Sequence, residues 1–358
     1  MTLRTATAVI DLNALTNNFR LIQSLSPNSK VLAVLKANGY GHGLERIAKA
    51  LPDADAFGVA RIDEALALRA AGIVKPIVLL EGFFAKEDID VLAIHNLQTI
   101  VHNSEQLAAI VDAAVKKPLK VWLKIDTGMH RLGINPGQLS DFYNALSQSN
   151  NVQQAIVLMS HLGCADEKDN PVTPKQLALF KELTADKALE KSLANSAGVL
   201  AWPESHYDWV RPGLMLYGVS PLASGVSVNG IAPVMTLQSS LIAVRDIAAG
   251  EAVGYGGAWV SEKSTTIGVI AIGYGDGYPR HAPNGTPVLV NGRRVPLIGR
   301  VSMDMITVDL GCDSHEQIGD IATLWGKGLP VEEVAEFATT IPYELLCNIT
   351  RRVHIQLA

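Results

Sequence analysis

The sequence has few cysteines, no long apolar run and no apolar leader, and each absence excludes something. Its three cysteines, Cys164, Cys312 and Cys347, are far apart and odd in number, which argues against a disulfide framework or a zinc site. No run of about eighteen apolar residues is present, as a membrane-spanning helix would need. The first residues, MTLRTATAVIDLNALTNNF, lack the apolar core of a secretory signal. We therefore expect a cytoplasmic protein without a metal or a membrane contact.

Strong charge of either sign is also missing. The formal net charge is -5 over 358 residues, which gives no basic footprint for nucleic acid or for an anionic membrane. What is present is a large apolar fraction of 48% beside 18% charged residues, the balance of a globular protein. This length predicts two packed units or one large barrel, and the charge favours a small-molecule partner.

Between about Lys30 and Gly218, short apolar runs alternate with helical patterns such as RIDEALALRAAG. Eight such β/α units favour a closed parallel barrel with helices outside, a TIM-like (β/α)8 barrel, although a doubly wound open sheet gives the same alternation. The strand candidates are VLAVLK from Val31, AFGVA from Ala56, PIVLLEG from Pro76, LQTIVHN from Leu97, LKVWLKID from Leu119, QAIVLMSH from Gln154, SLANS from Ser192 and DWVRPGLMLYG from Asp208.

After about Ile231 the pattern changes to alternating apolar and polar residues, as in TPVLVNGRRVPLIGRVSMDMITVDL. This alternation predicts a mainly antiparallel β domain, with Asn291 and Gly292 as a hairpin turn. The segment PLASGVSVNGIAP is rich in turn-forming residues and is the expected boundary. We therefore assign residues 1–230 to the barrel and residues 231–358 to the β domain.

Polar side chains follow five of the eight predicted strands. In such barrels the chemistry lies at the carboxyl ends of the strands, so these residues are expected to share one rim. An isolated lysine or histidine there is more often an ordinary strand end or a core group, but the joint occurrence is a stronger signal. The residues are Lys36 after the first strand, Lys124, Asp126 and Arg131 after the fifth, His161 after the sixth, Asn195 and Ser196 after the seventh, and Arg211 in the eighth.

A lysine, an arginine and a phosphate cradle together indicate a particular cofactor. Lys36 in apolar surroundings could form an imine with an aldehyde. The loops after strands seven and eight of a barrel often hold a phosphate through backbone N–H groups, and Ser196, Gly198, Gly213 and Leu214 occupy them. This combination is what a pyridoxal phosphate site requires. The segment GYGDGYPR from Gly273 is not a dinucleotide fingerprint and is expected to form a turn.

The chain resembles bacterial alanine racemases over essentially its full length. The matching segments are AVLKANGYGHG, WLKIDTGMHRLG, SHLG, WVRPGLMLYG, VGYGGAWVS, AIGYGDGYPR, GRVSMDMITVDL and PYELLCN. The resemblance implies a (β/α)8 barrel, a β domain, pyridoxal 5'-phosphate and a homodimer in which each β domain completes the partner's site. It implies interconversion of L-alanine and D-alanine, for peptidoglycan or for alanine catabolism.

The resemblance also assigns roles to residues. Lys36 would bond to pyridoxal phosphate and move the α-proton on the D face, and Tyr255 of the partner would serve the L face. His161 would neighbour both this tyrosine and Arg211, which would face the pyridine nitrogen. Because an arginine does not readily give up a proton, that nitrogen would stay unprotonated and the ring would be a weaker electron sink.

The resemblance also implies which residues bind the phosphate, which bind the substrate and which line the entrance to the site. The phosphate contacts would be Tyr40, Ser196, Gly213, Leu214 and Tyr343, with Asn195 beside them. The substrate carboxylate would meet Arg131 and the backbone at Met303 of the partner, while Tyr274 and Asp304 would line the entrance. Lys124 corresponds to a lysine that is carbamylated in many members and positions the arginine.

Three alternatives remain at the level of the sequence. The first is a racemase of serine, lysine or broad scope, since pocket volume decides specificity. The second is a pyridoxal-dependent decarboxylase, which Arg211 disfavours because such enzymes usually place an acid against the pyridine nitrogen. The third is a non-catalytic carrier of the cofactor, which would lack the segments VGYGGAW and VSMDM of the second domain.

Overall fold

The computed structural model describes residues 5–222 and 228–358, which form two compact units. The barrel unit is built on residues 16–216, and the sheet unit on residues 5–15, 217–219 and 229–358. The predicted boundary segment, residues 221–233, lies partly outside the described residues.

Eight short strands close into a parallel barrel in the order of the sequence. The last strand pairs with the first through Val210 and Val31, so the sheet has no open edge and the doubly wound alternative is wrong. Every position of β3, β4, β6 and β7 is buried, as expected for strands covered on both faces. The strands are β2 (Lys30–Val34), β3 (Ala56–Val59), β4 (Ile77–Leu79), β5 (Gln98–Val101), β6 (Val121–Lys124), β7 (Val157–Met159), β8 (Glu190–Ser192) and β9 (Trp209–Val210).

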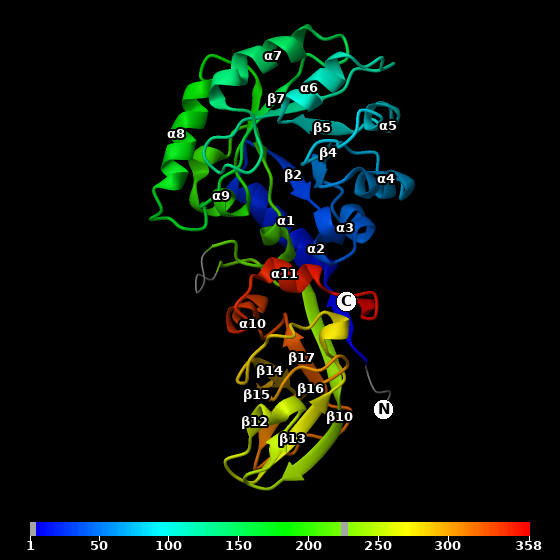
Figure 1. Cartoon of the computed structure of the whole chain (residues 1–358), viewed down its shortest axis with the longest axis vertical. Coiled ribbons are helices and arrows are strands. Elements are labelled where there is room, and N and C mark those ends of the chain that lie inside the picture. Colours follow the sequence, from blue (N-terminus) through cyan, green and yellow to red (C-terminus); the bar gives the residue numbers. More distant parts are fainter. Residues whose placement is uncertain (1–4, 223–227) are drawn as a thin grey trace. The chain divides into compact units, whose positions relative to one another are not determined.

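Amphipathic helices lie outside these strands (Figure 1). In α7, the buried residues Leu139, Phe142 and Leu146 recur at helical spacing and form one apolar face. In α6, the side chain of Asn103 accepts the Gln106 N–H and caps the first turn. The helices are α3 (Leu44–Ala50), α4 (Ile62–Ala70), α5 (Asp88–Ile94), α6 (Ser104–Val111), α7 (Leu139–Gln148), α8 (Val172–Thr184) and α9 (Ser196–Ala201).

The observed strands are shorter than the predicted runs, and two of the differences concern predicted site residues. β8 begins at Glu190 and ends at Ser192, so SLANS lies almost wholly beyond the strand. β2 ends at Val34, and Lys36 is the first residue of the short turn α2 (Lys36–Tyr40) instead of the last strand residue. The reason is that the backbone turns directly after Leu35, whose N–H makes the last bond to the neighbouring strand at Gly58.

The sheet unit contains an eight-stranded sheet, antiparallel apart from one parallel pair. Asn291 and Gly292 connect two neighbouring strands with φ of 49° and 81°, which confirms the predicted hairpin turn. The strand order is β13 (Thr265–Ile270), β16 (Ile306–Gly311), β15 (Arg293–Ile298), β14 (Pro287–Val290), β17 (Ile321–Trp325), β10 (Met235–Ile247), β1 (Thr7–Ile10) and β18 (His354–Leu357). Two strands, β11 (Ala252–Val253) and β12 (Trp259–Val260), pair separately, and two helices, α10 (Val331–Phe337) and α11 (Pro342–Cys347), complete the unit.

The first strand departs from the assignment of residues 1–230 to the barrel. β1 pairs with β10 on one side and with β18 on the other, so it belongs to the sheet unit. The pairing residues come from the far end of the chain, and a four-residue run carries no local signal of such partners. Helix α1 (Leu12–Leu25) follows it directly.

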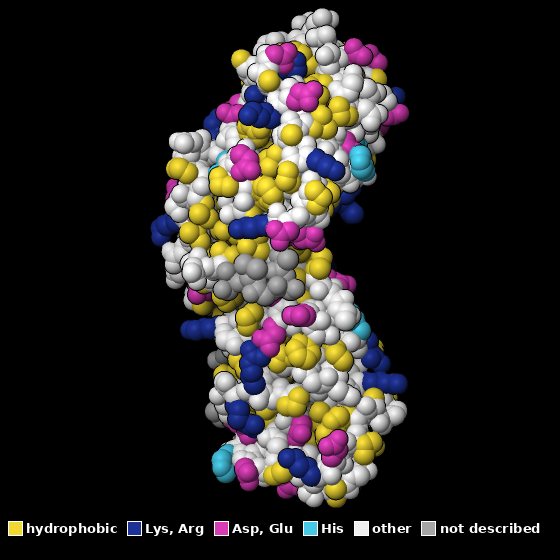
Figure 2. Space-filling view, turned by 90° about the vertical axis from the view of Figure 1, so that its left-hand side faces the viewer, with side chains coloured by type: hydrophobic (Ala, Val, Ile, Leu, Met, Phe, Trp, Pro, Cys, Tyr) yellow, Lys and Arg dark blue, Asp and Glu magenta, His cyan; other side chains and the backbone are white. Residues whose placement is uncertain are grey.

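One face of the molecule shows a mixture of charges. On the face drawn in Figure 2, Lys and Arg side chains are scattered among Asp, Glu and apolar side chains. In the described part of the chain, no helix is long and apolar enough to cross a membrane.

Candidate active site

Lys36 begins a left-handed turn at the carboxyl end of β2. The next four residues, Ala37 to Tyr40, have φ of 54°, 56°, 62° and 50°. For residues other than glycine this conformation costs roughly 1–2 kcal/mol each, so the surroundings must hold it. The side chain of Asn38 accepts the Leu44 N–H at 3.0 Å, and Gly39 N–H donates to Leu35 O at 2.7 Å. The turn therefore fixes Lys36 at its start and buried Tyr40 at its end.

Arg211 is buried beyond β9 and is held by neutral acceptors. Its guanidinium donates to Ser192 Oγ and to Ser160 O, both at 2.6 Å, and to Leu193 O at 3.3 Å. Its Nη2 also lies 3.3 Å from Nδ1 of His161. Within residues 5–222 and 228–358, no carboxylate forms an ion pair with it. Burial lowers the pKa of Arg211 to about 10, so it keeps its proton near neutrality.

Four cations gather around one histidine. Burial first, and then the charges of Arg211, Lys124, Arg131 and Lys36, hold the pKa of His161 well below its ordinary value. His161 is therefore neutral near pH 7. Because an arginine only donates, Nδ1 of His161 accepts from Arg211 and the ring proton is on Nε2.

Lys124 shares this positive environment at the end of β6. Its side chain is buried, and burial together with the charges of Arg211, Arg131 and Lys36 lowers its pKa to about 8. Glu81 is the acid that opposes this shift. About a tenth of Lys124 is thus an unprotonated amine at pH 7, far more than for an ordinary lysine, and this is the nucleophilic form.

The loops after β8 and β9 form a small polar cradle. Ser196 Oγ accepts the N–H of Gly213 at 2.9 Å and of Met215 at 3.3 Å. Asn195 caps α9 by accepting the Gly198 N–H at 2.9 Å. A Cβ on Gly213 would lie 2.4 Å from Tyr40 Oη, so only glycine lets this hydroxyl approach the loop. Leu214 follows in the same buried segment.

Arg131 lies on a loop whose backbone is tightly folded. Asp126 accepts the N–H groups of Gly128 and His130, and Asp126 and Lys124 bond across the loop to Ile134. The Arg131 side chain is exposed. It is nevertheless close enough to the other cations to lower the pKa of Lys124 and of His161.

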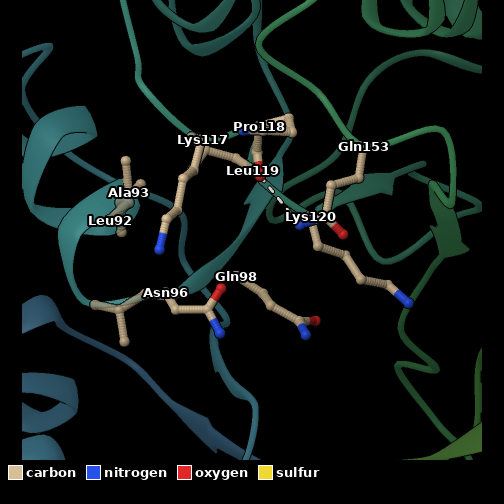
Figure 3. A pocket seen from close by; sticks show the side chains of 10 residues that line it. Leu92, Ala93, Asn96, Gln98, Lys117, Pro118, Leu119, Lys120 and Gln153 are labelled. Atoms are coloured by element: carbon tan, nitrogen blue, oxygen red, sulfur yellow. Dashed lines mark hydrogen bonds between the residues drawn. The ribbon is translucent and has the colours of Figure 1, made fainter.

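Cavities occur at both ends of the barrel strands. A cavity of about 510 Å³ at the carboxyl ends of β4, β5 and β6 is lined by Glu81, Phe84, His102 and Leu132 among others. At the amino ends of β5, β6 and β7, a cavity of about 170 Å³ is lined by Asn96, Gln98, Lys117, Lys120 and Gln153 (Figure 3). The predicted site residues of the barrel unit all follow the carboxyl ends of its strands, so the second cavity is outside the candidate site.

The sheet unit carries the other five predicted residues. Tyr274 and Met303 lie together, because Tyr274 N–H donates to Ser302 O at 3.0 Å and Gly275 N–H to Met303 O at 2.9 Å. Asp304 forms an ion pair of 2.7 Å with Arg352, which also pairs with buried Asp276 at 3.2 Å.

Tyr255 and Tyr343 lie on separate elements of the sheet unit. Tyr255 begins a short 3-10 turn, Tyr255–Gly257, and its side chain is 70% exposed. Tyr343 is on α11 and is 40% exposed. The segment GYGDGYPR forms a turn with Gly277 at φ 105°, as predicted.

Several supporting residues escaped the sequence analysis. Ser160 and Ser192 hold Arg211, and Gln176 on α8 donates to His161 O at 2.9 Å while accepting the Gly163 N–H at 2.9 Å. The two serines stand directly at strand ends, which is a usable signal. Gln176 is spaced like a core residue of its helix, and nothing in the letters marks it.

The chain matches two protein families that together cover most of its length. Residues 10–221 match the family described as "Alanine racemase, N-terminal domain", and residues 234–357 match "Alanine racemase, C-terminal domain". An alanine racemase of Vibrio atlanticus is 59% identical over 355 residues, which cover 99% of each chain. A protein of Escherichia coli, described as a biosynthetic alanine racemase, is 55% identical over 353 residues, or 98% of each chain.

Solved structures give the same result. The biosynthetic alanine racemase of Pseudomonas aeruginosa superposes with a TM-score of 0.96 at 44% identity, covering 99% of this chain and 100% of the other. The alanine racemase of Bartonella henselae, with covalently bound pyridoxal phosphate, superposes with a TM-score of 0.90 at 31% identity, covering 99% of each chain.

Proposed function

This chain belongs to the alanine racemase family, and on that premise we propose that it interconverts L-alanine and D-alanine with Lys36 and Tyr255 as the two acid–base groups. The observation that carries the proposal is the barrel rim, where Lys36, Lys124, Arg131 and Arg211 act on one neutral histidine. Such a concentration of positive charge suits a dianionic phosphate and a substrate carboxylate.

The cradle fits the phosphate of pyridoxal phosphate. Both acceptor positions of the Ser196 hydroxyl are used by the Gly213 and Met215 N–H groups, so its own proton is available to donate. An anion is the natural acceptor. Ser196, Gly213, Leu214 and Tyr40 would hold the phosphate, with Asn195 supporting the loop and Tyr343 as a further phosphate contact.

Arg211 fits the pyridine nitrogen. It is buried, it keeps its proton, and its bonds to Ser192 and Ser160 fix the plane of its guanidinium. When bound, the cofactor would supply an aldehyde and an electron-withdrawing ring that acidify the α-hydrogen of alanine. A guanidinium donates a hydrogen bond without transferring its proton, so it would limit how much charge the ring takes up and would favour return of the proton.

Lys36 and Tyr255 would exchange the α-proton on opposite faces of the substrate. Lys36 Nζ would serve the D face and Tyr255 Oη the L face, with Nε2–H of neutral His161 donating to the tyrosine oxygen. Arg131 would bind the substrate carboxylate, with Met303 beside it and Tyr274 and Asp304 at the entrance. Tyr274 and Asp304 would exclude amino acids bulkier than alanine.

Lys124 would carry a carbamate. Its unprotonated amine, with a pKa of about 8, would attack carbon dioxide: an N–C bond forms, one C–O π bond opens to give a carboxylate, and the nitrogen releases one proton to water. The resulting anion would lie among Arg211, Arg131 and Lys36 and offset their mutual repulsion. This supports the role of Lys124 in orienting Arg131.

The site would be completed by a second copy of the chain. The support is that Tyr255, Met303, Tyr274 and Tyr343 are 70%, 51%, 40% and 40% exposed on the sheet unit. In a homodimer each site would use Tyr255 of the partner subunit. We place the reaction in the cytoplasm and, because two relatives are described as biosynthetic, assign it to D-alanine supply.

Exchange of the α-hydrogen in deuterated water tests the activity. The purified protein with pyridoxal phosphate should exchange it from L-alanine and from D-alanine, and serine and lysine should react far more slowly. Tyr255→Phe should suppress exchange from L-alanine much more than from D-alanine. Equal loss on both faces would contradict the assignment, and rapid exchange of serine or lysine would contradict the substrate.

Subunit mixing tests the shared site. Lys36→Ala and Tyr255→Phe chains, each unable to racemise alanine alone, should regain racemisation when their subunits exchange. One of the two sites in each mixed dimer would then contain both Lys36 and Tyr255. Random exchange gives about a quarter of the sites. No recovery despite demonstrated exchange would mean that each site is built within one chain.

A further inference from the structure

Glu64 holds the backbone beside Lys36, although it comes from another β/α unit. It is the third residue of α4, and its Oε2 accepts the N–H of Ala60 at 2.9 Å and of Arg61 at 3.2 Å. Its Oε1 accepts the N–H of Ala37 at 2.7 Å. One carboxylate thus ties the turn after β2 to the loop after β3.

The bond to Ala37 exceeds what helix capping needs. A glutamate at this helix position commonly reaches back to the N-cap backbone, and the contacts with Ala60 and Arg61 satisfy that role. Ala37, in contrast, directly follows Lys36 and is the first of four residues at positive φ. Such a conformation persists only where neighbours hold it. Glu64 supplies a charged acceptor at its first residue, and charged acceptors make the stronger hydrogen bonds.

We propose that Glu64 is a positioning residue whose two carboxylate oxygens hold the left-handed turn so that Lys36 and Tyr40 face the cofactor together. The proposal rests on the proposed function, in which Lys36 bonds to pyridoxal phosphate and Tyr40 contacts its phosphate. These residues stand at the two ends of the turn, so relaxing the turn displaces both. Glu64 itself touches neither substrate nor cofactor.

Glu64→Gln is the sharpest variant because it keeps the size of the side chain. A carboxylate accepts on both oxygens, whereas an amide has one oxygen and one NH2 group that only donates. The variant therefore leaves either Ala37 N–H or the Ala60 and Arg61 N–H groups facing a donor. Glu64→Asp keeps two acceptors on a shorter stem and should restore part of the loss.

The matched control is Asp55→Asn at the other end of the same strand. Asp55 lies just before β3, and its Oδ2 accepts the Val31 N–H of β2 at 2.8 Å. This carboxylate also links β2 to the β3 segment, but at the amino end of the barrel, away from the rim. Asparagine keeps one acceptor oxygen, but a neutral one, so the link to Val31 weakens, which should lower stability without altering the cofactor site.

The measurement is a titration of each full-length apoprotein with pyridoxal phosphate, followed by absorbance and by the Kd. Glu64→Gln should weaken binding about tenfold, equivalent to about 1.4 kcal/mol, while Asp55→Asn stays within about twofold of wild type. In the loaded protein, Glu64→Gln should lower kcat with little change in the KM for alanine, since Arg131 is untouched. Equal weakening in both variants would show a merely structural role and overturn the proposal.

Lys36→Ala separates this proposal from the one on which it rests. If Lys36→Ala keeps the absorbance band of lysine-bound cofactor, the proposed function of Lys36 fails. If that band is lost in Lys36→Ala while Glu64→Gln binds as wild type does, only the role of Glu64 is overturned.

Discussion

The barrel unit and the sheet unit hold their site residues in opposite ways. In the barrel, Arg211 and Ser196 are buried and each bonds to several neighbours. In the sheet unit, Tyr255 and Met303 are 70% and 51% exposed. The first arrangement is built into a core, so changes there should cost stability as well as function. The second presents side chains outward, so changes there should cost function alone.

The largest effect is expected at Gly133, in the loop that carries Arg131. A Cβ there would lie 2.5 Å from Asp126 N and 2.8 Å from Ile125 C, at a φ of 139° that other residues rarely adopt. Gly133→Ala should lower the free energy of unfolding by about 3–4 kcal/mol, because the backbone itself must move. Urea unfolding measures the change.

Gly137→Ala is the control for that loop. No atom lies within 4 Å of a Cβ there, so the variant should change stability by less than about 1 kcal/mol. If Gly133→Ala proves as mild as Gly137→Ala, the loop is not held as the structure indicates. That result would contradict the expectation that changes in the barrel site cost stability as well as function.

The second prediction concerns the stability of the protein at low pH. Burial lowers the pKa of His42 to about 4, and burial with nearby cations lowers that of His161 well below its ordinary value. Because the folded pKa is lower than the unfolded one, the unfolded chain binds more protons below about pH 6.5. Stability should therefore fall as the pH drops through this window, and His42 alone should account for about 3 kcal/mol by pH 4.

Urea unfolding at pH 7, 5 and 4 measures how the free energy of unfolding depends on pH. His42→Asn should weaken this dependence, whereas His281→Asn, at an exposed position of the sheet unit, should leave it unchanged. The same pH dependence in wild type and both variants would show that His42 is not a source of the acid sensitivity.

The third prediction ranks the cations around Lys124. Arg211→Leu should raise the pKa of Lys124 from about 8 toward its ordinary value, since removing a neighbouring positive charge favours the ammonium form. Arg131→Leu should raise it less, because Arg131 contributes less to the shift. Reductive ¹³C-methylation of the lysines followed by NMR titration reports this pKa. An unchanged or lower value in Arg211→Leu would contradict the proposed cluster.

The same contrast explains what the sequence could predict. The eight β/α units and the hairpin at Asn291 follow from local patterns, and the structure confirms them. The polar residues after the strands follow from the same patterns, and their roles stay a prediction. The left-handed turn after Lys36 does not follow from such patterns, because Asn38 and Gly39 accept left-handed backbone but Ala37 and Tyr40 do not favour it, so the letters predict no run of four such residues. It exists through contacts with residues such as Glu64, which are distant in sequence.

Long-range pairing limited the prediction in the sheet unit as well. β1 belongs to the sheet because residues near both 236 and 356 pair with it, and no local signal could place it there. Exposed Tyr255 could be identified only by resemblance, since an outward tyrosine in a glycine-rich turn has no physical signature. Local sequence patterns therefore predict the site residues of the barrel unit better than the exposed site residues of the sheet unit.

The smallest effect on stability is expected at Asp304, one of two acidic residues that pair with Arg352. Arg352 bonds to exposed Asp304 at 2.7 Å and to buried Asp276 at 3.2 Å, and Asp276 also accepts the Gly273 N–H at 3.0 Å. Asp276→Ala should lower stability by about 1–2 kcal/mol, because a buried N–H loses its acceptor. Asp304→Ala should shift the Tm by less than about 1 °C, because water screens an exposed pair. Thermal unfolding of both variants decides the matter: an equally large drop in Asp304→Ala would mean that the outward residues of the sheet unit also support its fold.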